Sequence, residues 1–373
     1  MTPGPRRGLL RLADEVDPYP SEPSDEALAA ALGVPLHQLV RFDMNTLGGG
    51  PLPAVARALA DYDPGRVVEY GDQSYAALRA AIEATTGAPA HRIIPGAGAD
   101  ELIRLVTGLV IGPGDVVTIP TPTFAMFGVE ARLAGGRVVE VPRRHPAEQP
   151  EVAAIRAAAE ASGSRLVWLC SPNNPTGDAY PPEAIARLAE GLDAVVVVDT
   201  VYQELAEVGA GAHPEAWSLL PLQDRLPNLV ILRSLAKAYG LAGARVGYLV
   251  VPEGLAPRFE AARLPLAIGG PSEAAALGAL SDPATARARL AEIVVQRRRL
   301  AAALAGAGWE VLPSHANFLL VRPPDATATA AALLRRGLAV REYPSGPLVG
   351  WLRITARSAA ENDRLLGALA IEG

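Results

Sequence analysis

Short apolar runs alternate with segments of helical periodicity over the middle of the chain. Several runs are rich in β-branched residues and unbroken, as in strands buried on both faces of a sheet. We expect strands at Ile93–Ile94, Val116–Ile119, Val138–Val141, Leu166–Cys170, Val195–Val198, Leu229–Leu232 and Val246–Val251. The expected intervening helices include Glu101–Val110, Phe124–Leu133, Val152–Ala161 and Pro182–Gly191. This order predicts an α/β fold with a mostly parallel sheet covered by helices.

The pattern changes on either side of this region. Before it we expect helices at Ser24–Leu32, Pro53–Ala60 and Ser74–Thr86, the first with Ser24 as N-cap and Gly33 as its stop. After Pro265 a long helix, Ser272–Ala305, leads into strands at Asn317–Val321, Ala339–Glu342 and Trp351–Thr355. We therefore expect an N-terminal arm or small-domain segment (1–44), a large domain (45–265) and a smaller α+β domain (266–373).

Composition narrows the class of protein. The 373 residues are 50% hydrophobic and 20% charged, which is typical of a soluble globular protein. A net charge of -6 argues against nucleic acid or an anionic membrane as a partner. The single cysteine, Cys170, allows no intramolecular disulfide and no cysteine metal cluster, and we expect no metal site. Without a secretion signal or a long apolar span, the expected location is the cytoplasm.

Lys237 lies in an expected small-residue loop between two apolar runs, Leu229–Leu232 and Tyr248–Val251. Burying an ammonium group is costly and lowers its pKa. Lys237 is therefore a candidate amine nucleophile of the kind that forms a Schiff base. Ser234 and Arg245 flank it as candidate phosphate ligands. The alternative is that Lys237 extends to the surface and Arg245 pairs with an acid.

Asp199 ends the run of four valines, and Tyr202 follows it. A carboxylate in that position is costly unless a positive group meets it. A protonated heteroaromatic nitrogen or a structural arginine would serve. In open α/β sheets the ligand site lies beyond the carboxyl ends of the strands, where both residues are expected.

Further candidates follow other strands. The start of the helix expected after Ile93–Ile94 is made of small residues, and its free backbone N–H groups suit an anion. Asp100 and Glu101 in this segment also suit the first turn of an ordinary helix. Phe124 is a candidate for stacking on a planar ring, or a core aromatic. Asn174 lies in a loop between prolines, as a ligand or in an Asx turn. The residues of the helix start are Gly98, Ala99, Asp100 and Glu101.

These parts fit one cofactor, pyridoxal phosphate. It needs a lysine for the imine, an acid on the pyridine nitrogen, a phosphate site, a ring-stacking partner and donors to the phenolic oxygen. Asp199 would keep the ring nitrogen protonated, and Lys237 would move the proton at the substrate Cα. The other roles fall to Ser234, Arg245 and the helix start (phosphate), Phe124 (stacking), and Asn174 and Tyr202 (phenolic oxygen).

With these residues the chain resembles the pyridoxal-phosphate-dependent aminotransferases of the aspartate aminotransferase superfamily (fold type I, class I/II). Within that superfamily it is most similar to the histidinol-phosphate aminotransferases. The resemblance runs from Pro18 to Leu365. The motifs that carry it are Gly98-Ala99-Asp100-Glu101, Asn173-Asn174-Pro175-Thr176-Gly177 and the segment from Lys237 to Arg245.

The resemblance implies further roles. Arg353 matches the arginine that binds the substrate α-carboxylate or an equivalent group. Tyr70 matches a tyrosine that reaches the cofactor phosphate of the neighbouring subunit, which implies a homodimer with shared sites. Tyr19 and Arg341 match residues that hold the distal phosphate of the substrate. Alternatively, Arg353 and Arg341 are surface charges on strands and Tyr19 is an interface aromatic.

Three segments depart from the family pattern. The usual Asn-Pro-Leu-Gly is Asn45-Thr46-Leu47-Gly48, Ala236 replaces a common serine, and Ala356-Arg357-Ser358 replaces Val-Gly-Thr. The first and last border the substrate pocket in this family, so they bear on the identity of the substrate.

The expected activity is transamination between histidinol phosphate and a 2-oxo acid such as 2-oxoglutarate. The alternatives on the same scaffold are an aromatic or broad amino-acid aminotransferase and a threonine-phosphate-type decarboxylase. A non-catalytic module with the cofactor fold is a further alternative. It would be expected to carry a DNA-binding segment, for which residues 1–44 are too short and too acidic.

Overall fold

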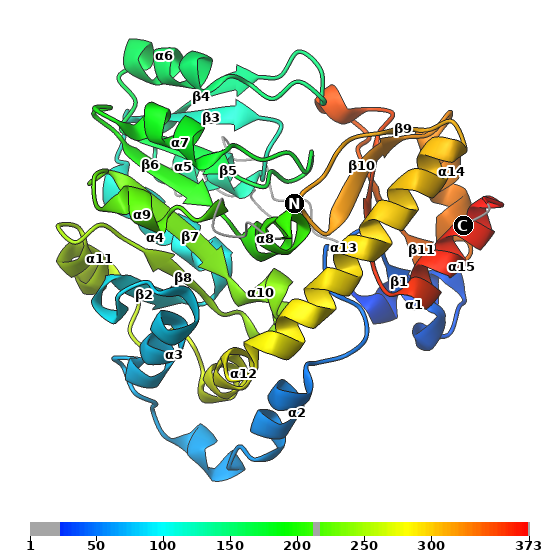
Figure 1. The fold of residues 1–373 in the computed structure, drawn as a ribbon, viewed down its shortest axis with the longest axis horizontal. Coiled ribbons are helices and arrows are strands. Elements are labelled where there is room, and N and C mark those ends of the chain that lie inside the picture. The colour runs from blue at the N-terminus through cyan, green and yellow to red at the C-terminus, as the bar shows by residue number, and fades with distance from the viewer. Residues whose placement is uncertain (1–22, 212–216, 372–373) are drawn as a thin grey trace, which may run out of the picture.

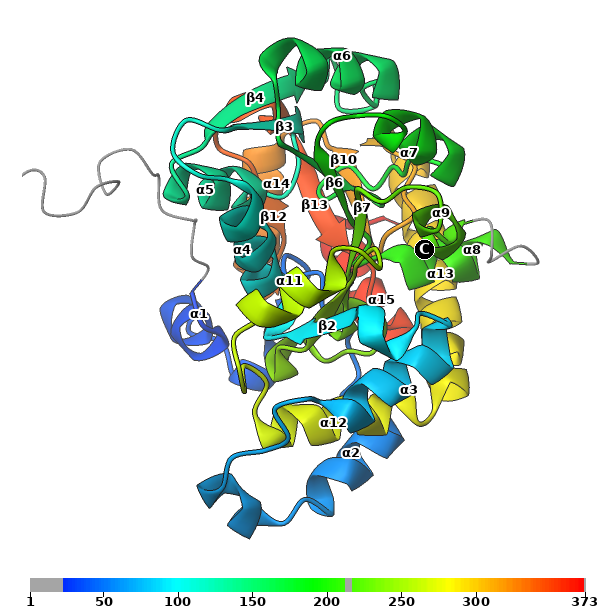
Figure 2. The same cartoon turned by 90° about the vertical axis from the view of Figure 1, so that its left-hand side faces the viewer.

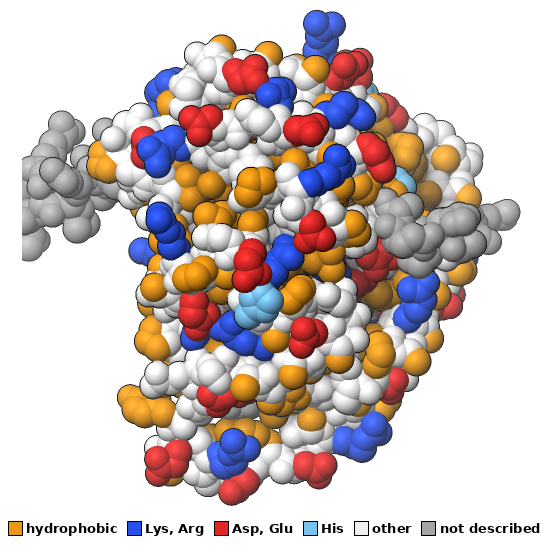
Figure 3. All heavy atoms as spheres, turned by 60° about the vertical axis from the view of Figure 1, so that its left-hand side comes forward, with side chains coloured by type: hydrophobic (Ala, Val, Ile, Leu, Met, Phe, Trp, Pro, Cys, Tyr) orange, Lys and Arg blue, Asp and Glu red, His pale blue; other side chains and the backbone are white. Residues whose placement is uncertain are grey.

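The computed structural model describes residues 23–211 and 217–371, so the candidate Tyr19 lies outside the described residues. These residues form a large α/β unit and a smaller unit beside it (Figure 1). The face in Figure 3 carries side chains of both charges, interspersed with apolar ones. None of the described helices combines the length and apolar character that crossing a membrane requires.

The large unit is built on a seven-stranded sheet in the order β2-β8-β7-β6-β5-β3-β4. β8 is antiparallel to both of its neighbours, and the other adjacent pairs are parallel. The expected mostly parallel sheet is therefore confirmed. The strands are β2 (Ile93–Gly96), β3 (Val116–Thr121), β4 (Arg137–Pro142), β5 (Leu166–Cys170), β6 (Val195–Asp199), β7 (Leu229–Ser234) and β8 (Gly247–Val250).

Helices cover both faces of this sheet because successive strand residues point to opposite sides. Val197 and Val230 pack with residues of α4, α5 and α11. Val196 and Val198 pack on the other face with residues of α6, α7, α8, α12 and the first half of α13. The bounds are α4 (Gly98–Val110), α5 (Met126–Leu133), α6 (Val152–Ser162), α7 (Pro182–Ala189), α8 (Gln203–Ala210), α9 (Leu220–Gln223), α11 (Ala256–Ala262), α12 (Gly270–Leu280) and α13 (Pro283–Gly306).

The smaller unit has an antiparallel sheet in the order β12-β13-β10-β9 and a parallel pair, β1 with β11. Its core joins Leu319 of β10 and Ile354 of β13 to Leu300 of α13, Leu333 of α14 and Leu365 of α15. The bounds are β1 (Val40–Arg41), β9 (Glu310–Val311), β10 (Phe318–Arg322), β11 (Leu338–Ala339), β12 (Arg341–Glu342), β13 (Leu352–Thr355), α14 (Ala326–Leu334) and α15 (Ala359–Leu369).

The N-terminal helices are α1 (Asp25–Leu32), α2 (Pro53–Ala60) and α3 (Ala76–Thr86). Ser24 caps α1 and Gly33 ends it with a left-handed conformation, as the sequence predicted. α2, α3 and α12 lie side by side (Figures 1 and 2). α12 follows residue 265 in the chain but packs on the large unit. The domain boundary that we expect at residue 265 therefore remains a prediction.

Three expectations about secondary structure were wrong. The long helix Ser272–Ala305 is two helices, α12 (Gly270–Leu280) and α13 (Pro283–Gly306). Asp282 caps α13 and Pro283 lacks the N–H that would continue α12. The single strand expected at Ala339–Glu342 is split, because β11 pairs with β1 and β12 with β13. Lys237 lies in a short helix, α10 (Leu235–Ala238), where a loop was expected.

Candidate active site

A cavity of about 580 Å³ lies beyond the carboxyl ends of β5, β6 and β7, and both units contribute to its wall. In the sheet, Cys170 at the end of β5 is paired with Asp199 at the end of β6, and Asp199 with Leu232 of β7. The parallel register therefore brings these strand ends together. The predicted site residues that line the cavity are Ala99, Asp100, Phe124, Asn174, Asp199, Tyr202, Ser234, Lys237, Arg245, Arg341 and Arg353.

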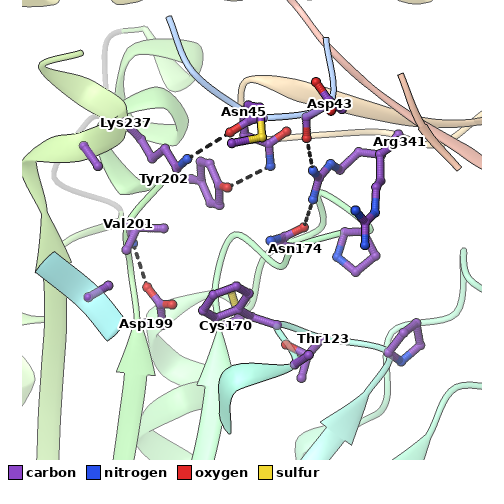
Figure 4. Close-up of a pocket in the computed structure, with 18 of the residues that line it drawn as sticks. Asp43, Asn45, Thr123, Cys170, Asn174, Asp199, Val201, Tyr202, Lys237 and Arg341 are labelled. Carbon is purple, nitrogen blue, oxygen red and sulfur yellow. Dashed lines mark hydrogen bonds between the residues drawn. The ribbon is translucent and has the colours of Figure 1, made fainter. Parts of the chain in front are cut away.

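Lys237 extends into the cavity from α10, which begins directly after β7 (Figure 4). Ser234 fixes the start of this helix, because its Oγ accepts a hydrogen bond from the Ala236 N–H at 3.2 Å. The Lys237 Nζ donates to the Met44 carbonyl oxygen at 3.3 Å. Burial, followed by the cations Arg353 and Arg245, lowers the pKa of the amine to about 8. A substantial fraction of the amine is thus neutral near physiological pH. It is also the only lysine in the chain.

Asp199 is a buried carboxylate at the end of β6, only 3% exposed. Its Oδ1 accepts a hydrogen bond from the Val201 N–H at 3.1 Å. Among the described residues Asp199 has no ion-pair partner. The alternative in which a structural arginine pairs with Asp199 is therefore excluded for the described residues. Burial raises the pKa of Asp199 to about 7. A cationic ligand group beside it would favour the ionised form.

The first turn of α4 faces the cavity beside Arg245, and no side chain caps it. Gly98 has φ +83°, and a Cβ there would lie 2.8 Å from the Arg245 Nη2. The positive φ favours glycine at this position, and free N–H groups of the turn and the Arg245 cation meet at one place. The same Arg245 Nη2 donates to the Asp100 Oδ2 at 2.6 Å, so it also pairs with an acid.

Glu101 has a local structural contact instead of a place in the cavity wall. Its Oε2 accepts a hydrogen bond from the Ala97 N–H at 3.2 Å, at the entry to α4. Burial is the largest influence on the Glu101 pKa and raises it. Neither Glu101 nor Gly98 lines the cavity of this chain.

Arg353 on β13 reaches from the smaller unit to Asn174 of the large unit. Its Nη1 donates to the Asn174 Oδ1 at 2.6 Å, and its Nη2 donates to the Asp43 carbonyl oxygen. The guanidinium lies 5.5 Å from the centroid of the Phe318 ring. Its buried Nε has no hydrogen-bond partner among the described residues. Both of these hydrogen-bond acceptors are uncharged, so the positive charge is available to an anion.

Tyr202 lines the cavity at the start of α8 and is 2% exposed. Its Oη accepts a hydrogen bond from the Asn45 Nδ2 at 3.0 Å. Burial raises the pKa of the phenol, so Tyr202 keeps its proton.

Phe124 lies on another part of the wall, with its ring 5.8 Å from that of Phe127 in an edge-to-face arrangement.

Arg341 on β12 also lines the cavity, and its guanidinium lies 6.0 Å from the Tyr343 ring centroid. Tyr70 does not join this group of residues. Its side chain is 89% exposed in the single chain and does not line the cavity.

Several wall residues had no assigned role in the sequence. Asp43, Met44 and Asn45 lie just before or within the departing Asn45–Gly48 motif, which was the one signal for them. Cys170 was expected to be buried; it is, and it also lines the cavity. Tyr343, Ser345 and Leu348 carried no recognisable pattern. Within the described ranges no three or more His, Cys, Asp or Glu residues form a potential metal site.

The chain is similar to known proteins over nearly its full length. The family described as aminotransferase class I and II matches residues 37–369. A histidinol-phosphate aminotransferase of Roseiflexus castenholzii is 37% identical over 372 residues, 97% of each chain. One from Xanthomonas campestris pv. campestris is 40% identical over 310 residues, 80% of this chain and 83% of the relative.

Solved structures show the same relationship. The histidinol-phosphate aminotransferase of Sinorhizobium meliloti, solved in complex with pyridoxal-5'-phosphate, matches with a TM-score of 0.85 and 28% identity. The match covers 99% of this chain and 97% of that one. The L-threonine-O-3-phosphate decarboxylase of Porphyromonas gingivalis, 22% identical with a TM-score of 0.73, shares the fold and covers 89% of this chain and 98% of its own. The chain therefore belongs to the class I and II aminotransferases, which confirms the family and the enzyme class, a pyridoxal-phosphate-dependent aminotransferase, that the sequence predicted.

Proposed function

We propose that this enzyme transfers the amino group of histidinol phosphate to a 2-oxo acid such as 2-oxoglutarate, with pyridoxal phosphate bound in the cavity. The observation that carries the proposal is one cavity lined by an amine of lowered pKa, a buried carboxylate and two arginines. These are Lys237, Asp199, Arg353 and Arg341. The names of the relatives support the choice of substrate.

Three features of the cavity fit the cofactor. Asp199 is buried and forms no ion pair within the described residues, as a partner for a pyridinium nitrogen would be. The uncapped start of α4, with Arg245 above Gly98, suits a phosphate. Lys237 is the only lysine of the chain and so carries its only side-chain amine. The remaining roles are proposed as predicted: Ser234, Ala99, Asp100 and Glu101 at the phosphate, Phe124 on the ring, and Asn174 and Tyr202 at the phenolic oxygen.

Bound there, pyridoxal phosphate supplies an electron sink for the electron pair of the broken Cα–H bond. Asp199, once ionised, holds the proton on the ring nitrogen. Lys237 in its neutral form takes the proton from Cα and returns it, and its pKa of about 8 suits both directions near neutral pH. The polar groups around Arg353 hold its guanidinium in place while the substrate binds.

The two arginines support substrates with negative groups at two positions. Arg353 is the proposed ligand of the group at Cα, which is a carboxylate in the 2-oxo acid. Arg341 is the proposed ligand of the distal phosphate or carboxylate. Tyr19 is proposed beside Arg341 from the sequence alone, because it lies outside the described residues.

We also propose a homodimer with shared sites. Val67, Val68 and Tyr70 are 66%, 83% and 89% exposed, an unusual run of apolar surface on the segment between α2 and α3. A second copy would cover this segment and bring Tyr70 to the partner's cofactor phosphate. Light scattering measures the oligomeric state, and Tyr70→Ala should weaken cofactor affinity without changing the residues of its own cavity.

An amino-donor panel tests the proposed substrate. The purified enzyme, loaded with pyridoxal phosphate, is given histidinol phosphate, phenylalanine or threonine phosphate with 2-oxoglutarate, and glutamate and carbon dioxide are both measured. We expect glutamate with histidinol phosphate as the preferred donor. Equal use of phenylalanine would instead indicate a broad aminotransferase, and release of carbon dioxide from threonine phosphate would indicate a decarboxylase.

A further inference from the structure

Asn45 joins the two units of the fold directly behind Tyr202. It is 2% exposed and adopts a left-handed backbone, φ 53°, a region that asparagine tolerates better than most residues. Its Nδ2 donates to the Tyr202 Oη at 3.0 Å (Figure 4), and its Oδ1 accepts from the Thr355 hydroxyl at 3.0 Å. Its carbonyl oxygen accepts from the Asn317 Nδ2 at 3.0 Å.

The direction of these hydrogen bonds follows from Thr355. The Thr355 Oγ1 already accepts the Asn45 backbone N–H at 3.1 Å, so its single hydrogen is free to be donated. Thr355 is fully buried, and the Asn45 Oδ1 is the acceptor within reach. Reversing the amide would leave the threonine hydrogen without this acceptor, which is costly in a buried site. The Asn45 NH₂ group therefore faces Tyr202.

This orientation determines what Tyr202 can do. A phenol has one hydrogen, and an oxygen that accepts from Asn45 keeps that hydrogen for another partner. Tyr202 lines the cavity, and its hydroxyl donates no hydrogen bond to any of the described residues. An accepted hydrogen bond also stabilises the phenolate form and so makes the phenol a stronger donor.

We propose that Asn45 is a positioning residue that polarises Tyr202 and directs its hydroxyl hydrogen into the cavity, toward the phenolic oxygen of the cofactor. The inference rests on the proposed function, because it needs pyridoxal phosphate in this cavity. Thr355 lies on β13 and Asn317 directly precedes β10, so the smaller unit sets the amide that acts on a tyrosine of the large unit.

The test is a pH titration of the visible absorbance of the cofactor-loaded enzyme. A stronger hydrogen bond from the Tyr202 hydroxyl to the phenolic oxygen of the cofactor stabilises the negative charge on that cofactor oxygen. It therefore lowers the apparent pKa of the chromophore. Asn45→Gly keeps the left-handed backbone and removes the donor, so it should raise that pKa by about 0.5 to 1 unit. Asn45→Asp puts an acceptor beside Tyr202, draws the phenol hydrogen away and should raise it further.

A Tyr202→Phe background separates this role from a general structural one. There the shift caused by Asn45→Gly should disappear, because no hydroxyl remains to be polarised. Asn317→Ala is the matched control: it removes a hydrogen bond to the Asn45 carbonyl but leaves the amide on Tyr202, so the chromophore pKa should stay unchanged.

The outcomes are distinct. The role of Asn45 would be overturned if Asn45→Gly left the chromophore pKa unchanged, or if it shifted that pKa equally in the parent and Tyr202→Phe backgrounds. The proposed function would stand in either case. An unsubstituted enzyme that acquires no visible absorbance with pyridoxal phosphate would overturn both. If Asn45→Asp does not fold, Asn45→Gly in the two backgrounds still decides the matter.

Discussion

The Nη1 of Arg353 donates to the Oδ1 of Asn174 at 2.6 Å, a hydrogen bond between residues 179 positions apart. It joins β13 of the smaller unit to the loop after β5 in the large unit. The cavity is therefore assembled by the packing of the two units, and the Arg353 guanidinium is held by neutral acceptors.

Arg353→Lys should reduce kcat/KM for the 2-oxo acid by about 10- to 100-fold, mainly through KM. A lysine keeps the charge but loses the planar fork, and a charge-assisted hydrogen bond contributes about 1.5–3 kcal/mol. Steady-state kinetics with 2-oxoglutarate measures this. Arg335→Lys, on an exposed residue at the end of α14, is the control and should change neither constant. An unchanged KM in Arg353→Lys would remove Arg353 from the substrate site.

Without cofactor, Asp199→Asn should stabilise the chain above pH 7 by roughly 2–4 kcal/mol. The folded pKa of Asp199 is raised from 3.8 to about 7, so its contribution is fully present below pH 3.8 and lost as the pH rises through 7. The stability gap between variant and parent should therefore open between pH 4 and 7.

Urea unfolding of cofactor-free protein at several pH values measures this gap. Asp193→Asn, an exposed residue just before β6, is the matched control. A gap that is independent of pH would show that Asp199 ionises normally in the fold. Loaded with pyridoxal phosphate, Asp199→Asn should instead lose cofactor affinity, since its neutral amide cannot pair with a pyridinium.

The loading of pyridoxal phosphate should follow the titration of Lys237. The neutral amine reacts, so the initial rate at which visible absorbance appears should rise with pH through a midpoint of about 8, far below the ordinary 10.5. Because Arg353 is the second cause of the lowered pKa, Arg353→Met should move the midpoint upward.

Stopped-flow absorbance on the cofactor-free protein gives these rates, and Lys237→Ala should show no band. With a single lysine in the chain, amine-directed labelling reports only Lys237 and the α-amino group. A midpoint near 10.5 would contradict the burial argument, and a band that persists in Lys237→Ala would remove Lys237 from its role.

Arg341→Ala should reduce kcat/KM about 10- to 100-fold for phosphorylated donors and much less for plain amino acids. The reason is that only a distal phosphate would form the charge-assisted hydrogen bonds that the substitution removes. Histidinol phosphate and phenylalanine, measured side by side, give the ratio. Arg322→Ala on the exposed end of β10 is the control. Equal losses for both donors would contradict histidinol phosphate as the preferred substrate.

Local patterns in the sequence predicted much of this molecule. Val195–Val198 predicted a strand buried in a sheet, and Ser24 and Gly33 predicted both ends of α1. Lys237 and Asp199 were recognised because each is a charge next to apolar chain, where burial is costly. Such features depend on neighbours a few positions away, so one sequence reports them.

Only the tertiary structure decided which groups act on these residues. The Asn45–Tyr202 hydrogen bond spans 157 positions, and the split of the strand expected at Ala339–Glu342 depends on two different partner strands. Pairing and packing of segments that are far apart in the chain set these contacts, and no periodicity along the chain encodes them. The sequence by itself thus determined the fold class and the charged candidates, while the tertiary structure decided the hydrogen-bond partners that set their orientation and acidity.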